Sequence, residues 1–330
     1  MSSVANGWDA AWRVAVDAWI GAGLTRSGRR PAGEVEQVKL RSWSLVLRVP
    51  AEPDQVWFKA GGPGCAYEAG LVEALAGWAE RSVLPPLAVE RERGWLLLPD
   101  GGPTLRSVLA EGGEQAHWEQ LLPYYAELQR ELAGRVDEML ALGVPDQRPL
   151  AVPGALAELL TDTDALLLDR EGGMTTADRE RLLALQPQVA AWAKQLDGYG
   201  IAPSLNHDDF HDGNVFLRDG HYVFFDWGDA AVSHPFASLL VTLNVIAHQK
   251  GLGPGSAELV RMRDAYLEPW TGEYDRTDLV EAVRLATRLG KVGRALSWRR
   301  ALVGGTPEEI APWADGVPGW LTELFEPDLI

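Results

Sequence analysis

The sequence has almost no cysteine and no long apolar run. Cys65 is the single cysteine among 330 residues, so an internal disulfide framework is excluded and a reducing compartment suits the chain. No stretch approaches the roughly 20 apolar residues that a membrane helix needs. The N-terminus has no basic patch followed by an apolar segment, which argues against a signal peptide. These absences predict a cytoplasmic globular protein.

Basic residues are scarce beyond the first hundred positions. The chain has 30 Lys and Arg against 47 Asp and Glu, a net charge of −17. Residues 1–103 hold 11 basic and 12 acidic residues, whereas residues 104–330 hold 19 and 35. Such a surface repels nucleic acid and anionic membranes and attracts cations. Neither nucleic acid nor a membrane is therefore expected as a partner. The alternative is that the acidity only aids solubility.

The N-terminal third predicts a small sheet. The first 24 residues have the pattern of an amphipathic helix, with Asn6 as the N-cap and Trp8, Trp12, Val16 and Trp19 on one face. Strands and one helix follow, and the order β-β-β-α-β-β is that of an antiparallel sheet with one helix. The strands are expected at 35–40, 43–49, 56–60, 83–89 and 94–98, and the helix at 66–81.

After residue 99 the pattern changes to mainly helical. Residues 100–103, rich in Gly and Pro, are a linker candidate. We therefore expect an α+β fold of two lobes, with a small antiparallel β lobe over 1–99 and a larger, mainly helical lobe over 104–330. The helices are expected at 105–110, 118–142, 156–169, 177–196, 235–249, 257–266, 278–303 and 313–325. Residues 288–300, basic and aromatic, predict a packed helix with a solvated face or a surface for an anionic or hydroxyl-rich molecule.

The segment 207–228 carries the most informative spacing. His207, Asp209 and Asn214 fit H-x-D-x-x-x-x-N, and Asp226-Trp227-Gly228 follows, where a kinase has its metal-binding D-F-G. Phosphoryl transfer needs a carboxylate near the attacking hydroxyl and oxygen ligands for magnesium. One short hairpin would supply all of these groups.

Within this segment, Asp209 is the candidate catalytic base, and Asn214 and Asp226 are the candidate Mg²⁺ ligands. The alternative for Asp209 is a carboxylate that bonds its own loop, and for Asn214 a turn residue. We interpret His207 and His211 as structural, because the pair has no evident third ligand for zinc.

Lys59 ends an apolar strand, Val56-Trp57-Phe58-Lys59, similar to the V-A-I-K strand whose lysine reaches the nucleotide phosphates. A buried lysine needs a partner. Glu68 in the following helix is expected, with Glu73 as the fallback. The alternative is a surface lysine whose stem alone is buried.

Two further segments predict nucleotide contacts. Residues 96–100 fit a hinge for the base, with Leu98 and Asp100 as candidates, since Pro99 has no N–H to donate. The turn at 40–44 would cover the phosphates. It lacks G-x-G-x-x-G, so Ser44 and backbone N–H groups would act there.

Residues 207–238 resemble the aminoglycoside phosphotransferase and choline kinase-like family, which shares the protein-kinase fold. Its members read His-Gly-Asp-x-His-x-x-Asn and then Ile-Asp-Trp-Gly-Asp, close to the segment here. The resemblance implies ATP and Mg²⁺ as cofactors, Asp209 as base, Asn214 and Asp226 as metal ligands, and Lys59 as a phosphate contact. Five positions depart from the family pattern, namely Asp208 for glycine, Asp212 for proline, Ser233 for glycine, His234 for Asp, and Ser238 for a second Asp.

The expected function is an ATP-dependent small-molecule kinase that phosphorylates a hydroxyl group. A cationic acceptor, such as an aminoglycoside or amino sugar, is favoured by the carboxylates flanking the presumed transfer site. These candidates are Asp208, Asp212 and Asp229, with Glu268 and Glu273 further away.

Other readings stay open at the level of sequence. The alternative acceptors are a neutral sugar, a nucleoside or an amino-alcohol, and ATP is not distinguished from GTP. A nucleotide-binding pseudokinase scaffold is a second class, against which the retained Lys59, Asp209, Asn214 and Asp226 argue. A protein kinase is disfavoured because no A-P-E-like segment follows Gly228.

Overall fold

A computed structural model of the chain describes residues 10–112 and 117–330. Asn6 and Trp8 lie outside the described residues. The chain divides into two compact units. The first comprises residues 1–105, 214–229 and 300–313, and the second comprises residues 106–213, 230–299 and 314–330. The division passes through the segment 207–228, so the hairpin belongs to the first unit and the loop before it to the second. The role of residues 100–103 as a linker stays a prediction.

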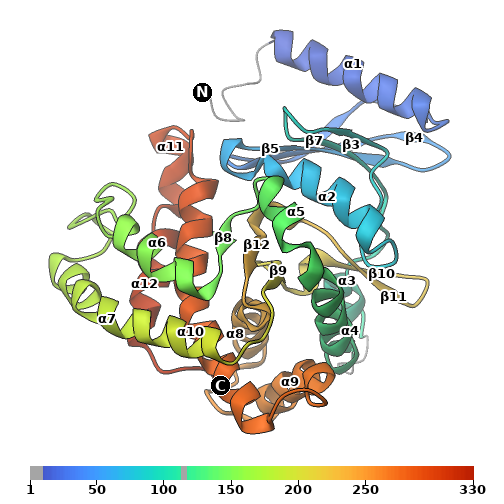
Figure 1. Cartoon of the computed structure of the whole chain (residues 1–330). Helices are drawn as coiled ribbons and strands as arrows, with labels where there is room; N and C mark the ends of the chain where they lie inside the picture. The colour runs from blue at the N-terminus through green and yellow to red at the C-terminus, as the bar shows by residue number, and fades with distance from the viewer. Residues whose placement is uncertain (1–9, 113–116) are drawn as a thin grey trace. The chain divides into compact units, whose positions relative to one another are not determined.

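The first unit contains a five-stranded antiparallel sheet in the order β2-β3-β5-β7-β6. Figure 1 labels three of these strands, β3, β5 and β7. The predicted strands are present with shifted ends. They are β2 (Glu36–Arg41), β3 (Ser44–Val49), β5 (Val56–Gly61), β6 (Ala88–Glu90) and β7 (Trp95–Pro99). The strand predicted over 83–89 begins only at Ala88, because Val83 instead forms a bridge with Phe224.

The alternation of side chains along these strands divides the sheet into two faces. One face, with Leu47, Phe58 and Leu97, is fully buried against helix α1 (Ala10–Arg26), which covers the sheet in Figure 1. Trp19 of α1 meets Trp95 edge to face, with 5.7 Å between the ring centroids. The other face turns toward a cavity and helix α2 (Tyr67–Trp78). Burial of a large apolar side chain contributes roughly 1.5–3 kcal/mol, so α1 fixes the sheet from the side away from the cavity.

The hairpin of β10 (Val215–Arg218) and β11 (His221–Phe224) completes the first unit. Its turn residues Asp219 and Gly220 have φ of 50° and 78°, the backbone of a two-residue Asp-Gly turn. A bridge between Thr104 and Phe216 joins the hairpin to the rest of the unit. Shorter elements of this unit are β1 (Arg30–Pro31), β4 (Ala51–Glu52) and α11 (Pro307–Ile310).

The second unit is mainly helical, as predicted. Its helices are α3 (Leu105–Ala110), α4 (His117–Leu132), α5 (Val136–Ala141), α6 (Val152–Leu159), α7 (Thr176–Gly198), α8 (Leu239–Lys250), α9 (Ala257–Leu267), α10 (Arg276–Ala301) and α12 (Gly316–Thr322). The helix predicted over 118–142 is interrupted by a 3-10 turn at Ala133–Arg135. The helix predicted over 156–169 was misplaced, since α6 ends at Leu159.

A small three-stranded sheet in the second unit was not predicted. Strand β12 (Ala231–Ser233) pairs in parallel with β8 (Asp146–Gln147) and antiparallel with β9 (Ser204–Asn206). Strands of two or three residues give no period that a sequence pattern can reveal. Strand β9 matters for function because it leads directly into His207.

Among the described residues, no helix combines the length and the apolar character that crossing a bilayer requires.

Candidate active site

A cavity of about 340 Å³ lies on the open face of the sheet in the first unit. Val46, Trp57 and Leu98 line it from the strands. Phe216 and Phe225 line it from the hairpin segment. Their rings are stacked, with 3.9 Å between the ring centroids and an interplanar angle of 13°. Gly101 approaches so closely that a Cβ there would lie 2.2 Å from the Phe216 ring. The walls are therefore flat, apolar and closely packed, which suits an aromatic ligand.

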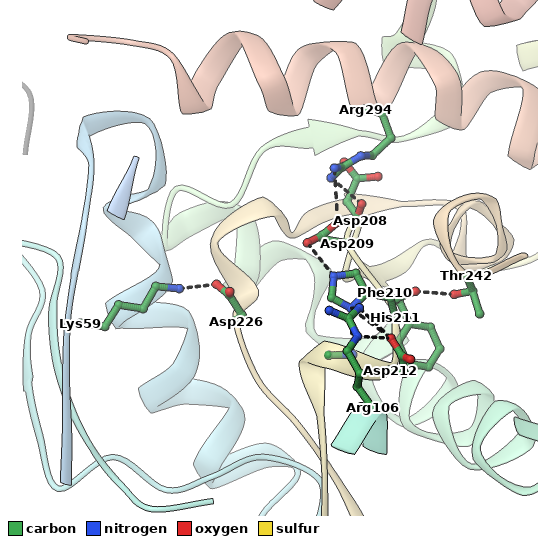
Figure 2. Close-up of polar contacts among 11 residues, drawn as sticks. Lys59, Arg106, Asp208, Asp209, Phe210, His211, Asp212, Asp226, Thr242 and Arg294 are labelled. Carbon is green, nitrogen blue, oxygen red and sulfur yellow. Dashed lines mark hydrogen bonds and ion pairs between the residues drawn. The ribbon is translucent and has the colours of Figure 1, made fainter. Parts of the chain in front are cut away.

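Lys59 lines this cavity as part of a charged cluster, and Figure 2 shows its contact with Asp226. Its Nζ donates to Glu68 Oε1 at 2.6 Å and also to Asp226. The predicted ion pair with Glu68 is therefore present, and Glu73 pairs with Arg91 instead. Burial lowers the pKa of Lys59, but the negative charges of Asp226 and Glu68 more than offset this and raise the pKa above its ordinary value. Lys59 is thus a fixed cation with two carboxylates.

Asn214 and Asp226 lie at the same end of the hairpin. Val215 pairs with Phe224 in the ladder, and the N–H of Phe225 donates to the carbonyl of Asn214 at 3.1 Å. Asp226 has a left-handed backbone with φ of 64°. Its side chain is 35% exposed and lines the cavity, whereas Asn214 is buried and is not part of the lining.

The chemistry of these two side chains fits a magnesium ion, because both offer hard oxygen ligands and Mg²⁺ keeps several waters. Within residues 10–112 and 117–330, no cluster of three or more His, Cys, Asp or Glu side chains forms a metal site. A metal held here would therefore depend on the amide of Asn214 and on ligand oxygens in addition to Asp226.

Three predicted nucleotide contacts lie around the same cavity. Ser44 and Leu98 both line it, and Ser44 is buried opposite Gly61 in the ladder. Asp100 also lines the cavity, but its carboxylate accepts hydrogen bonds from Gln55 and from the N–H of Gly102. The Asp100 side chain therefore shapes its own turn. Its use of a backbone N–H as a base contact stays a prediction.

The loop after β9 in the second unit carries Asp209 and is fixed by buried hydrogen bonds. The N–H of His207 donates to the hydroxyl of Tyr125 at 3.1 Å, and Thr242 donates to the carbonyl of Phe210 at 2.8 Å. His207 is fully buried, in agreement with its interpretation as a structural residue. These contacts hold the loop from α4 and α8 at once.

Both carboxylate oxygens of Asp209 have partners (Figure 2). Arg294 Nη2 lies 3.3 Å from Oδ1, and His211 Nε2 lies 3.5 Å from Oδ2. Burial raises the pKa of the Asp209 carboxyl, but the charge of Arg294 and the hydrogen bond from His211 outweigh burial and hold the pKa well below its usual range. Asp209 is therefore an anion at neutral pH.

Asp208, predicted to face the acceptor, lies buried in contacts of its own unit. Its backbone is left-handed with φ of 60°, a conformation that Asp tolerates better than most residues. Ser297 donates to its Oδ2 at 2.5 Å and Asn206 donates to its Oδ1 at 3.1 Å. The replacement of the family's glycine is thus accommodated by local bonding. Both carboxylate oxygens of Asp208 therefore already have donors, and its contact with an acceptor remains a prediction.

The other predicted acceptor contacts differ in exposure. Asp212 is buried and accepts from Arg106 at 3.0 and 2.7 Å. Glu268 is exposed at the end of α9, and Glu273 pairs with Arg130. Asp229, in the first unit, is half-buried, and its carbonyl accepts from Arg300 at 3.4 Å.

Helix α10 contains Arg294, a residue of the candidate site that the sequence did not predict. The segment 288–300 was predicted to have a solvated face, but Lys291 and Arg294 are 6% exposed. Lys291 donates to the carbonyl of Glu323 at 2.6 Å, and Arg294 contacts the loop of Asp209. The spacing of basic residues along a helix is the same whether their side chains contact solvent or a carboxylate far away in the sequence. No signal in the sequence therefore identified Arg294.

Two departures from the family pattern are structural. His234 begins a 3-10 turn, and its Nδ1 accepts from the N–H of Phe236 at 3.2 Å. Burial lowers the pKa of His234 to about 3. Ser238 donates to Asn206 Oδ1 at 2.7 Å and accepts from Gln129 at 3.1 Å. Both residues stabilise the segment that supports the loop of Asp209.

The fold is that of kinase-like phosphotransferases. A choline/ethanolamine kinase family protein from Mesorhizobium loti has 14% identity and a TM-score of 0.60, with 96% of this chain and 95% of that chain covered. A choline kinase from Cryptosporidium parvum has 12% identity and a TM-score of 0.58, with 94% of each chain covered. The macrolide 2'-phosphotransferase MphH from Brachybacterium faecium has 18% identity and a TM-score of 0.55, with 92% and 98% covered.

A search of curated protein sequences gives no match. Residues 104–280 match the model of the phosphotransferase enzyme family, APH. This span is more than half of the chain, and the protein belongs to that family. It is a phosphotransferase that acts on a hydroxyl acceptor. The resemblance read from residues 207–238 and the predicted α+β fold are both confirmed.

Proposed function

We propose that the protein is an ATP- and Mg²⁺-dependent kinase that transfers the γ-phosphate to a hydroxyl group of a small molecule. The observation that carries this proposal is that Lys59, Glu68 and Asp226 are paired with one another and line the apolar cavity in the first unit. A flat apolar cavity suits a nucleobase, and a fixed cation beside it suits phosphate oxygens.

The base would lie between the strand residues Val46 and Leu98 and the ring of Phe216, all of which line the cavity. Stacking on an aromatic ring contributes roughly 1–3 kcal/mol per base. Ser44 and backbone N–H groups of the same turn would contact the phosphates, because oriented donors bind anions well. Lys59 would bind phosphate oxygens while Glu68 holds its side chain in place.

Asp226 and Asn214 are the residues that would hold Mg²⁺. When bound, the ion would neutralise charge on the phosphate oxygens. The partly exposed carboxylate of Asp226 and its contact with Lys59 support this assignment, since the same carboxylate lines the cavity.

Asp209 would orient the acceptor hydroxyl and take its proton. Its carboxylate is ionised at neutral pH, as the low pKa described above requires. A weak base is sufficient for this role, because the transition state of phosphoryl transfer is loose and depends mainly on positioning.

For the acceptor we propose a cationic molecule such as an amino sugar or aminoglycoside. The second unit supports this choice, with 17 Lys and Arg against 30 Asp and Glu, whereas the first unit has 13 and 17. Asp208 and Asp212 support it less than the sequence suggested, since Arg294 and Arg106 compensate their charges. The long-range field of the second unit and exposed carboxylates such as Glu268 therefore carry this part of the proposal.

A panel of acceptors tests the proposal directly. The protein is incubated with Mg-ATP and, in turn, with amino sugars, aminoglycosides, amino-alcohols, neutral sugars and nucleosides, and ADP release is measured. Turnover with cationic acceptors is expected. Turnover with neutral acceptors alone would contradict the cationic part and leave the kinase assignment intact. Thermal shift with Mg-ATP, compared in wild type and Lys59→Ala, tests the nucleotide site separately, because a ligand that binds the native state raises its stability.

A further inference from the structure

Arg294 of helix α10 is almost completely buried beside the loop of Asp209, at 6% exposure. Its Nη1 donates to the carbonyl of Asp208 at 2.6 Å, and its Nη2 donates to Asp209 Oδ1 at 3.3 Å (Figure 2). One planar guanidinium therefore contacts the backbone of one loop residue and the carboxylate of the next. A rigid fork of donors is suited to this double contact.

The same face of α10 makes a second contact with the loop. Ser297 lies three residues after Arg294, and its hydroxyl donates to Asp208 Oδ2 at 2.5 Å. Residues three apart on a helix lie side by side. The left-handed backbone of Asp208, with φ of 60°, is thus held through its carbonyl and its side chain by a single turn of α10. The orientation of the next residue, Asp209, depends on this backbone.

The far side of the Asp209 carboxylate faces His211. The Nδ1 of His211 accepts from the N–H of Gly213 at 3.0 Å and lies 3.2 Å from Nη2 of Arg106. With Nδ1 used as an acceptor, a neutral His211 carries its proton on Nε2, which lies 3.5 Å from Asp209 Oδ2. Asp209 is therefore held by a permanent cation on one oxygen and by an imidazole on the other.

We propose that Arg294 is the positioning residue of the phosphoryl transfer, holding the Asp209 carboxylate in the orientation that accepts the acceptor's proton. This inference depends on the proposed role of Asp209. Other charged or titratable groups that face Asp209 are His211, His207 and the neighbouring Asp208. Of these groups, Arg294 is the one whose side chain stays charged throughout the pH range in which proteins fold.

The charge of Arg294 has a consequence for the pH profile. It lowers the pKa of Asp209 against the effect of burial. If that charge is removed, the pKa of Asp209 rises, and the acidic limb of kcat/KM moves to higher pH. A role limited to stabilising the fold would leave this limb in place.

Two substitutions separate charge from geometry. Arg294→Gln removes the charge, and we expect kcat to fall about 10- to 100-fold with the acidic limb at least about one pH unit higher. Arg294→Lys keeps the charge but cannot make both contacts, so kcat should fall about 3- to 10-fold with the limb nearly unchanged. Arg299→Gln, on the same helix but paired with Glu158 and Asp162, is the matched control and should keep kcat and the limb.

The measurements are kcat and KM for ATP and acceptor from the lowest pH at which the protein stays folded to about pH 8, with a melting temperature for each variant over the same range. Wild-type kcat and an unmoved limb in Arg294→Gln would overturn the inference. If Arg294→Gln does not fold, Arg294→Lys still decides, since an unchanged kcat would equally overturn it.

A second readout does not need turnover. The ionisation of Asp209 can be followed by NMR of carboxyl-labelled aspartates, with Asp209→Asn to assign the signal. A higher midpoint in Arg294→Gln is expected, and an identical midpoint would overturn the inference even if no acceptor had been found. Full activity of Asp209→Asn, in contrast, would contradict the proposed function rather than the contact itself.

Discussion

The two units use their carboxylates in opposite ways. In the first unit, Asp226 and Glu68 share one cation, Lys59, and Asp226 remains accessible from a cavity. In the second unit, Asp208 and Asp209 face Arg294, and Asp212 faces Arg106. The first arrangement leaves negative charge for a metal ion. In the second arrangement, the arginines compensate the charge of the carboxylates, and Arg294 fixes the orientation of the Asp209 carboxylate. The same short motif therefore supplies an open site on one unit and a braced loop on the other.

The contrast also changes the interpretation of the acidic composition. In the sequence, the field of the carboxylates that flank the presumed transfer site favours a cationic acceptor. Since a paired charge acts on its partner more than on a distant ligand, the buried pairs contribute little to that field. The exposed carboxylates of the second unit remain as its source.

The open site of the first unit is tested most strongly by Asp226→Asn. We expect phosphate transfer to fall at least about 100-fold, because a Lewis-acid metal contributes several kcal/mol. Mg²⁺ should also stop enhancing ATP binding, as measured by titration with and without the ion. Asp219→Asn, in the exposed hairpin turn, is the control. Unchanged Mg²⁺ dependence in Asp226→Asn would remove Asp226 from the metal site.

The burial of His234 in the second unit is tested by the pH dependence of the free energy of unfolding. His234 has a pKa of about 3 in the folded protein because of burial, below its unfolded value of about 6.5. As pH falls below about 6.5, the unfolded chain binds a proton that the folded chain does not, so stability decreases. The free energy of unfolding should lose about 2 kcal/mol from this group between pH ~6.5 and ~5.

Chemical denaturation of His234→Asn across this range checks the expectation, because Asn keeps a capping acceptor and cannot titrate. The exposed His221→Asn serves as the control. Equal pH dependence in wild type and His234→Asn would show that His234 does not carry this effect.

The shape of the cavity is tested by Gly101→Ala. A Cβ at Gly101 would meet the Phe216 ring at 2.2 Å, so the stacked rings must move. We expect KM for ATP to rise about 10-fold, close to 1.4 kcal/mol, with a smaller change in acceptor KM. Gly77→Ala, whose Cβ meets nothing within 4 Å, should leave KM unaltered. If KM for ATP is the same in Gly101→Ala, Gly77→Ala and wild type, the adenine base does not bind in this part of the cavity.

The smallest effect is expected for Asp212→Asn. Loss of the pair with Arg106 should lower stability by about 1 kcal/mol, since one partner is exposed. Acceptor KM should change less than about 3-fold, which is below 1 kcal/mol. A KM increase restricted to cationic acceptors would instead show that Asp212 contacts them. Glu268→Gln, measured in parallel, tests the exposed candidate.

Much of this arrangement could be predicted from the sequence where local pattern and chemistry agree. The strand ending in Lys59 was visible as an apolar run with a charged end, and Glu68 followed as the nearest partner in the next helix. One short hairpin that carries the motif residues was predicted, and β10 and β11 form it. The matching family confirms the fold that these features suggested.

The remainder depended on contacts between segments far apart in the chain. Nothing near Asp208 or Asp209 reveals that Arg294 lies beside them, since 85 residues separate Arg294 from Asp209. The strands β8, β9 and β12 are too short for any periodicity. The predicted acceptor role of Asp208 was based on charge alone, and burial with Ser297 could not be read from charge.

The central claim is that the cavity of the first unit and Asp209 of the second serve one phosphoryl transfer. It is tested most directly by the transfer of labelled γ-phosphate from ATP to an acceptor that is active in the panel, compared in wild type and Asp209→Ala. We predict a Mg²⁺-dependent labelled product with wild type and a rate at least about 100-fold lower with Asp209→Ala, while ATP still binds. Equal rates in the two proteins, or equal background hydrolysis with no labelled acceptor, would contradict the account and favour a nucleotide-binding scaffold.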